Sequence, residues 1–270
     1  MLVFVLALFG LIIGSFLNVV ILRFGQQGIG GRSACPSCGT RLRWHDLIPV
    51  LSWLALRGRC RYCKARISVQ YPLVEAGTAA LFAGIGGAGL RPAPLVLALA
   101  IAALLVCIFV YDLRHKLIPD AWVWPFCACG LTFAFLSPYL IHDTLYVMLA
   151  GPVAAFPILF LWYLSKPFTG HAGMWMGFGD VKLSLGIGWL VGFPLGLIAI
   201  FFAFVIGAVI SVCVLLPLPY LLGWWGLRPL PAAGGYTMKS EVPFGPFLIV
   251  SCLIVWFAVM YGVPLSLVDL

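Results

Sequence analysis

The chain has 270 residues, of which 63% are hydrophobic and only 9% are charged, and its formal net charge is +8. Soluble globular proteins average about 45–50% apolar and about 25% charged residues. This composition excludes a soluble enzyme, and it excludes a disordered chain, which needs few apolar residues. In so apolar a chain, the basic residues indicate membrane orientation and not a nucleic-acid partner.

Apolar segments follow one another along the chain, and a helix needs about 20 mainly apolar residues to cross a bilayer. They predict an all-α, polytopic integral membrane protein with about eight transmembrane helices. The segments run over 1–22, 72–90, 93–111, 122–140, 144–164, 181–193, 195–222 and 244–262. The strands of a membrane barrel would alternate apolar and polar residues, and these segments do not. Gly192-Phe193-Pro194 predicts a tight turn between the sixth and seventh segments.

The first segment is predicted to be a retained membrane helix and not a secretory signal. No basic residue precedes Leu2, Arg23 follows the apolar run, and no small-x-small cleavage site ends it. Nine of the sixteen Lys and Arg residues lie between Arg23 and Arg66. If that loop is cytoplasmic, eight crossings place fifteen of the sixteen cations inside, and only Arg91 lies outside. Both termini are then expected to be periplasmic.

Residues 23–71 form the long polar stretch of the sequence and are predicted to be a small cytoplasmic loop domain. The stretch contains two Cys-x-x-Cys pairs separated by 21 residues, Cys35 with Cys38 and Cys60 with Cys63. Four thiolates at such spacing are typical of the tetrahedral zinc site of a zinc ribbon. Disulfides or a redox motif are the alternatives, but a cytoplasmic loop is kept reduced. We therefore predict a structural Zn²⁺ held by the four cysteines.

The residues between the two cysteine pairs allow two interpretations. Trp44 and Trp53 flank apolar residues, which is typical of a segment that lies at a membrane interface. The hydrophobic core of a small ribbon would explain the same pattern. His45 is interpreted as a bystander, because four cysteines already complete the metal site.

Two carboxylates stand at predicted helix ends, where an ionisable residue at membrane depth indicates function. Asp112 ends the third segment and Asp180 opens the sixth, so both are expected at the cytoplasmic face. Two neighbouring carboxyl groups do not both ionise easily, so that one activates a water while the protonated one polarises a carbonyl. Gly177 and Gly179 carry no side chain that would obstruct a substrate backbone beside Asp180. This pattern favours aspartic-protease chemistry.

Each carboxylate also has a structural interpretation. Asp112 and Asp180 could act as helix N-caps or as interfacial charges near Arg114 and Lys182. Asp120 follows a proline and precedes a helical segment, so capping is the favoured reading there. Three further acids are expected to be solvated, namely Asp46, Asp143 and Asp269.

Other protease chemistries lack their motifs in this sequence. There is no His-Glu-x-x-His for a zinc protease and no Gly-x-Ser-x-Gly for a serine nucleophile. The glycines of 84–89 lie in a membrane segment without a preceding strand, so they indicate close helix packing and not a nucleotide loop.

Six motifs in order resemble the type IV prepilin peptidase family, and the resemblance spans nearly the whole chain. They are Gly14-Ser-Phe-Leu-Asn18 with Arg23, the paired cysteines, Gln70-Tyr-Pro-Leu-Val-Glu75, Asp112 with Ile118-Pro-Asp120, Gly177-Phe-Gly-Asp-Val-Lys-Leu183 and Pro243-Phe-Gly-Pro-Phe247. The Gly-x-Gly-Asp element also resembles the presenilin-type intramembrane aspartic proteases.

The resemblance implies a bifunctional enzyme of the bacterial inner membrane. Asp112 and Asp180 match the catalytic pair of the family, with Gly177, Gly179 and Lys182 in a supporting role. The implied substrates are type IV prepilins or pseudopilins, cut after a Gly and then methylated on the new N-terminal residue, usually Phe. S-adenosylmethionine is the implied methyl donor, and Glu75 is a candidate residue of its site. A pair between Glu75 and a loop arginine is the alternative.

The sequence also allows functions of other classes. A transporter with Asp112 and Asp180 as ion sites leaves the cysteine pairs unexplained, and an inactive assembly factor leaves the intact carboxylates unexplained. We predict three parts: a first membrane helix at 1–22, a loop domain at 23–71 and a membrane-embedded peptidase at 72–270. The lipid bilayer is an expected partner, whereas the number of chains that assemble is not predicted.

Overall fold

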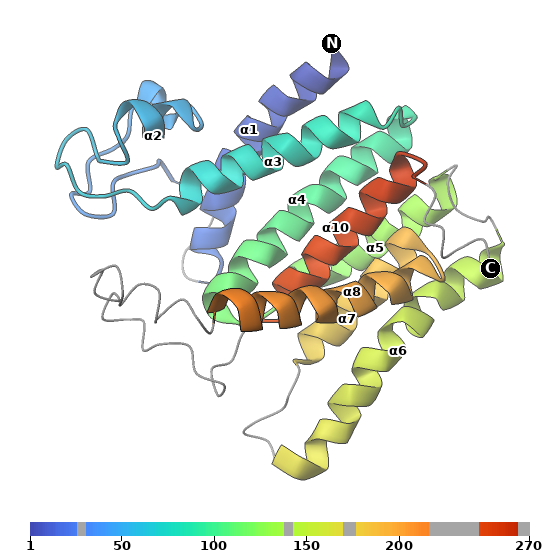
Figure 1. Ribbon diagram of the computed structural model, residues 1–270. Helices are drawn as coiled ribbons and strands as arrows, with labels where there is room; N and C mark the ends of the chain where they lie inside the picture. The colour runs from blue at the N-terminus through green and yellow to red at the C-terminus, as the bar shows by residue number, and fades with distance from the viewer. Residues whose placement is uncertain (26–30, 138–142, 170–176, 216–242, 264–270) are drawn as a thin grey trace. The chain divides into compact units, whose positions relative to one another are not determined.

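The computed structural model describes residues 1–25, 31–137, 143–169, 177–215 and 243–263 (Figure 1). These parts are helical and hold no strand beyond two isolated bridges, Ala34 with Arg41 and Arg59 with Arg66. The long helices are α1 (Leu2–Arg23), α3 (Gln70–Gly87), α4 (Pro92–His115), α5 (Asp120–Leu136), α6 (Thr144–Thr169), α7 (Phe178–Val191), α8 (Leu195–Ile210) and α10 (Gly245–Met260). The short elements are a 3₁₀ turn (Trp44–Leu47), α2 (Leu51–Ala55) and a π turn (Ser211–Leu215).

The predicted all-α class is confirmed, and each of the eight apolar segments holds one of the long helices. Four helices in the described part are long and apolar enough to cross a membrane: α1, α4, α6 and α8 with its π turn. Helices α5 and α10 are apolar but shorter. Eight crossings therefore stay a prediction. Several predicted features lie outside the described residues, namely 138–140, 216–222, Arg228, Lys239 and Asp269.

The chain divides into two compact units, Met1–Val110 and Tyr111–Leu270. In the first unit, α3 lies along α1 (Figure 1). Two glycines of α1 allow this close approach, because a Cβ at Gly10 would lie 2.7 Å from the Cα of Ala79 and one at Gly14 2.7 Å from the Cα of Glu75. Asn18, one turn after Gly14, donates from Nδ2 to the carbonyl oxygen of Tyr71 at 3.2 Å. The Gly14–Asn18 motif thus joins α1 to the first turns of α3.

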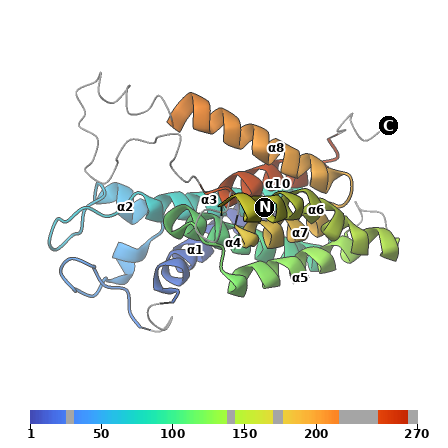
Figure 2. The same ribbon diagram turned by 90° about the horizontal axis from the view of Figure 1, so that it is seen from below.

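In the second unit, α7 packs against four helices: α5, α6, α8 and α10 (Figures 1 and 2). Helix α7 can approach these neighbours closely because glycines lie on the surfaces that face them. A Cβ at Gly188 would lie 2.9 Å from the Cα of Gly151 on α6, and one at Gly186 would collide with Phe126 on α5. The predicted turn after α7 is confirmed, since Gly192 has a φ of +77° and α8 begins at Leu195. The start of α7, which carries Asp180, is thereby held by packing farther along the helix.

The contact between α1 and α3 can be tested with two identical substitutions. Gly10→Ala places a methyl group against backbone atoms of α3, which cannot rotate away, and is expected to destabilise the protein by about 1–3 kcal/mol. Gly77→Ala is the matched control, because no heavy atom of the described residues outside its own helix lies within 4 Å of the added carbon. Thermal unfolding in detergent should show a lowered midpoint for Gly10→Ala alone. Equal midpoints would contradict the packing described above.

Candidate functional site

The end of α4 and the start of α7 carry the two predicted catalytic carboxyl groups, and both are buried within the second unit. Asp112 lies in the last turn of α4, which ends at His115 and is followed by Lys116 with a φ of +53°. Asp180 is the third residue of α7 and accepts the backbone N–H of Gly177 at Oδ2, at 3.2 Å. The two carboxyl groups lie close enough for the charge of Asp112 to act on Asp180. Residues 68 positions apart in sequence thus meet at one place.

One carboxyl oxygen of this pair lacks a hydrogen-bond donor of normal geometry in the described part of the chain. Asp112 Oδ2 is buried, and no donor among the described residues forms a hydrogen bond to it. Buried polar atoms are nearly always satisfied in folded proteins, so an unsatisfied one has capacity to bind water or a ligand group. The backbone of Gly245 lies against this oxygen, because a Cβ at that position would collide with it.

Ile118 packs between the two glycine-containing segments of the site. A Cβ at Gly179 would lie 2.9 Å from the Cβ of Ile118, and one at Gly245 would lie 3.2 Å from its Cδ1. Close packing against Ile118 thus explains why position 179 is a glycine, whereas the sequence suggested that a glycine there lets a substrate approach. At Gly177, by contrast, a Cβ would have only Asp180 and Gly179 within 4 Å among the residues that the structure describes. The sequence motif Pro243–Phe247 pointed to Gly245, but only the fold shows that it faces Asp112.

Lys182 and Asp120 form an ion pair, with 2.6 Å between Nζ and Oδ1. The expected capping role of Asp120 is wrong, because Pro119 is the N-cap of α5 and no side chain caps this helix. The ammonium group also lies over the rings of Phe178 and Trp124, 5.1 and 5.9 Å from their centroids. The cation that follows Asp180 in sequence therefore neutralises Asp120 on α5.

Within the first unit, the four predicted metal ligands come together: the ligand atoms of Cys35, Cys38, Cys60 and Cys63 lie within 4.8 Å of one another. The two pairs have the same local fold. The backbone carbonyl oxygen of each first cysteine accepts an N–H across a tight turn: Cys35 from Gly39 at 2.9 Å and Cys60 from Lys64 at 3.0 Å. Gly39 and Lys64 both have a positive φ, +67° and +60°.

The chemistry of these thiols suits a cation. Hydrogen bonds with Thr40 lower the pKa of Cys38 to about 6. The N–H of Ala65 lowers the pKa of Cys63, but burial and the three neighbouring thiols outweigh it and raise the value to about 11. Four thiols so close together cannot all ionise without a positive charge among them. The cluster can therefore hold a metal ion, because four thiolates are a common set of ligands for a tetrahedral metal site.

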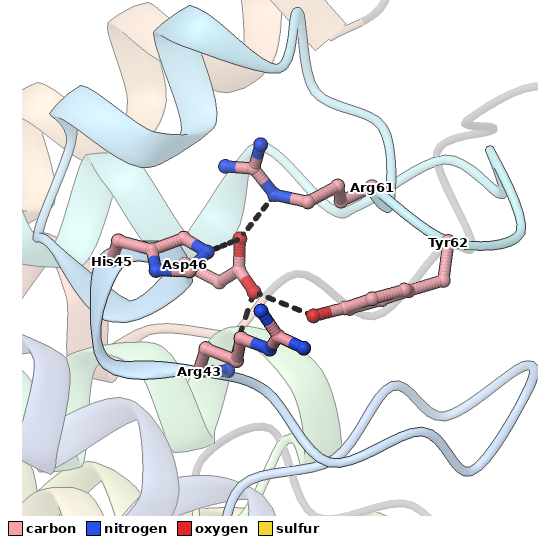
Figure 3. Close-up of polar contacts among 5 residues, drawn as sticks. All are labelled: Arg43, His45, Asp46, Arg61 and Tyr62. Atoms are coloured by element: carbon pink, nitrogen blue, oxygen red, sulfur yellow. Dashed lines mark hydrogen bonds and ion pairs between the residues drawn. The ribbon is translucent and has the colours of Figure 1, made fainter.

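Asp46 braces the second cysteine pair, and the expectation that it is solvated is wrong. Its side chain is only 3% exposed and accepts Arg61 Nε at 2.7 Å and Tyr62 Oη at 3.4 Å (Figure 3). Arg61 and Tyr62 are the two residues between Cys60 and Cys63. Burial raises the pKa of Asp46. The hydrogen bonds from Arg61 and from the backbone N–H of Arg43 lower the pKa by more than burial raises it, so the net shift is downward.

His45 lies beside this carboxylate and outside the four-thiol cluster. Its Nε2 is 3.6 Å from Asp46 Oδ1 (Figure 3). His45 lies between the two cysteine pairs in sequence, but in the structure its side chain contacts the carboxylate of Asp46 and not a thiol.

Glu75 is buried in the second turn of α3. Its Oε2 accepts the backbone N–H of Val50 at 2.7 Å, and the hydroxyl group of Ser15 on α1 also donates to it. The alternative of a pair with a loop arginine is wrong, because the bond runs to the loop backbone instead. Val50 is held at a φ of +61°, which is unusual for a β-branched residue.

The architecture defines a helical membrane protein with a buried pair of aspartates and a separate four-thiol cluster. Two family descriptions match successive parts of the chain: the bacterial peptidase A24 N-terminal domain over residues 8–86 and the type IV leader peptidase family over residues 99–212. The chain therefore belongs to the type IV leader peptidase family.

Similar proteins cover most of the chain. A prepilin leader peptidase/N-methyltransferase of Aeromonas hydrophila is 31% identical over 94% of this chain and 89% of its own length. The protein of the same name from Xanthomonas campestris is 32% identical over 92% and 88%. That from Dichelobacter nodosus is 31% identical over 98% and 93%. No solved structure matches this chain.

The bracing role of Asp46 predicts an effect on metal affinity. Asp46→Asn removes the charge that holds Arg61, and loss of such support around metal ligands costs about 10- to 100-fold in affinity. Titration of the full-length protein with Co²⁺, followed by thiolate-to-metal absorption, measures this change. Asp143→Asn is the control, because Asp143 is exposed and its side chain bonds only the N–H of Leu145 among the described residues. Equal Co²⁺ affinity in the two variants would contradict the role of Asp46.

Proposed function

We propose that this protein is a membrane aspartic endopeptidase that cleaves the leader of type IV prepilins or pseudopilins after a Gly, and that it then N-methylates the new N-terminal residue. The observation that carries the proposal is the juxtaposition of Asp112 and Asp180, buried and with one oxygen unsatisfied. Family membership and the names of the similar proteins support both activities.

In the proposed reaction, one carboxylate takes a proton from water as the water oxygen attacks the scissile carbonyl carbon. The other carboxyl group donates its proton to the carbonyl oxygen. When the C–N bond breaks, the carboxyl group that took the water proton donates it to the leaving amine. A hydroxyl group of the tetrahedral diol returns its proton to the other carboxylate, so the two carboxyl groups again share one proton. The Gly177 N–H, bonded to Asp180 Oδ2, fixes the orientation of that carboxyl group. Asp112 Oδ2, which has no donor in the described part of the chain, is available to water or substrate.

The proposed site of action is the cytoplasmic face of the bacterial inner membrane. Fifteen of the sixteen cations fall on that side if the chain crosses eight times, which also makes both termini periplasmic. A prepilin leader ends where its apolar helix begins, so its cleavage site would meet Asp112 and Asp180 at that face. The proposed parts are the first helix at 1–22, the loop domain at 23–71 and the peptidase at 72–270.

Zinc is the proposed metal of the four cysteines, since four thiolates in two Cys-x-x-Cys turns are its preferred structural site. S-adenosylmethionine is the proposed methyl donor. Glu75 is proposed to contribute to the methylation centre, because it is a buried acid that contacts both α1 and the loop domain. Lys182 has a supporting role through its ion pair with Asp120, as do Gly177 and Gly179 through the backbone geometry around Asp180.

Incubation of the purified protein with a prepilin and S-adenosylmethionine tests both activities at once. Mass spectrometry separates loss of the leader from addition of a methyl group. Asp112→Asn and Asp180→Asn should each abolish cleavage, because neither variant retains an acid and a base in the pair. Asp143→Asn is the matched control and should cleave normally. Normal processing by either active-site variant, or ion flux in proteoliposomes without a peptide product, would overturn the peptidase assignment.

Loss of the metal is expected to reduce methylation more than cleavage. The cysteine cluster and Glu75 belong to the first unit, whereas Asp112 and Asp180 have their neighbours in the second. Cys35→Ser with Cys60→Ser should lose about one zinc per chain by metal analysis, and Glu75→Gln should lower methylation while cleavage continues. Cys107→Ser is the control, because this buried cysteine lies outside the cluster. Equal loss of both activities would show that the loop is a general folding element.

A further inference from the structure

The segment between the two cysteine pairs exposes large apolar side chains on a strongly basic loop. We define an apolar patch by five residues, which are 38–79% exposed: Trp44, Leu47, Ile48, Leu51 and Leu54. The second tryptophan behaves differently. Trp53 donates from Nε1 to the carbonyl oxygen of Ile67 at 3.3 Å, and its ring lies 2.9 Å from where a Cβ of Gly58 would be. Trp53 therefore belongs to the interior of the loop, and the apolar patch does not.

The loop is joined to helix α3 beside this patch. Val50, the N-cap of α2, donates its N–H to Glu75 on α3 at 2.7 Å. Glu75 is five residues into α3, which is roughly 8 Å from the start of the helix at a rise of 1.5 Å per residue. Leu73, two residues earlier, is 66% exposed on the outer surface of α3. The start of α2 thus lies at the level of the first turns of α3, which is the level of the membrane interface if α3 forms the predicted second crossing.

The charge of the loop complements an anionic surface. Eight of its basic residues are exposed: Arg32, Arg41, Arg43, Arg57, Arg59, Arg61, Lys64 and Arg66. Asp46 is the single acid between residues 23 and 71, and Arg61 occupies its carboxylate. Arg43 directly precedes the apolar patch in sequence, and Arg57 follows three residues after Leu54. Apolar side chains bordered by unneutralised cations are typical of segments that lie in the interface of anionic bilayers.

We propose that the apolar patch inserts into the interface of an anionic bilayer, with α2 lying in the membrane plane and the Glu75–Val50 hydrogen bond setting its depth. Leu51 and Leu54 stand one helical turn apart and enter the acyl boundary, while the arginines on either side contact phosphate groups. This inference does not depend on the proposed peptidase or methylation chemistry.

Photo-crosslinking in nanodiscs identifies the occupant of the patch. The full-length chain carrying Leu51→benzoylphenylalanine is placed in bilayers with phosphatidylglycerol, a prepilin is added, and the adducts are identified by mass spectrometry. Lipid adducts are expected to dominate at Leu51 and to exceed several-fold those at Arg41→benzoylphenylalanine, an exposed control beside the first cysteine pair. Adducts mainly to the prepilin or to a second copy of the chain, or lipid adducts at the control level, would overturn the proposal.

Hydrogen exchange provides a second test that does not need an unnatural residue. In the same nanodiscs, Leu51→Ser with Leu54→Ser removes the apolar anchor of α2, so its backbone amides should exchange several-fold faster. Ala55→Ser is the matched control: it also introduces serine into α2, at an exposed position that carries only a methyl group. Equal exchange in the double variant and in Ala55→Ser would overturn the insertion of Leu51 and Leu54.

Discussion

A carboxylate removed from water must be met by donors or cations, and this constraint organises the protein. Only eight acids occur in the chain. Asp46 is met by Arg61, Glu75 by the N–H of Val50, and Asp180 by the N–H of Gly177. In each case the bond ties together segments whose relative position matters: a cysteine pair to the turn between the pairs, the loop to α3, and the first turn of α7 to its own N-cap. Asp112 Oδ2 departs from this pattern in the described residues.

Close packing of glycines fixes the elements that carry these acids. Gly10 and Gly14 let α3 approach α1, and Asn18 and Glu75 then form polar bonds across the same contact. In the second unit, Gly188 lets α7 approach α6 with backbone against backbone. Apolar side chains gain little from meeting each other in place of lipid, so small residues that admit close approach determine how membrane helices associate. The acids are thus positioned by residues that have no chemistry of their own.

The sequence predicted the helices, the four-thiol cluster and the meeting of Asp112 with Asp180, because each leaves a local pattern. Apolar runs mark helices, spacing marks the cysteine turns, and a charge at the end of an apolar run is conspicuous. Partner choice among charges left no such pattern. Asp120 was expected to cap a helix, yet it forms an ion pair with Lys182 from another helix. Asp46 was expected to be solvated, yet its side chain is buried and forms an ion pair with Arg61. Such pairs depend on which helices and turns become neighbours, which spacing along one chain does not encode.

The sequence left two interpretations open for Glu75, a place in the methylation centre and a pair with a loop arginine, and the structure shows a bond to the loop backbone. Its carboxylate could serve methylation directly, or it could serve by holding the loop. A direct bond from a backbone N–H does not depend on the side chain at position 50, and it places Val50 at a positive φ, where a β-branched residue is disfavoured. The loop adopts this conformation at the point where α2 begins. The carboxylate of Glu75 therefore joins α3 to the loop at the residue where α2 begins.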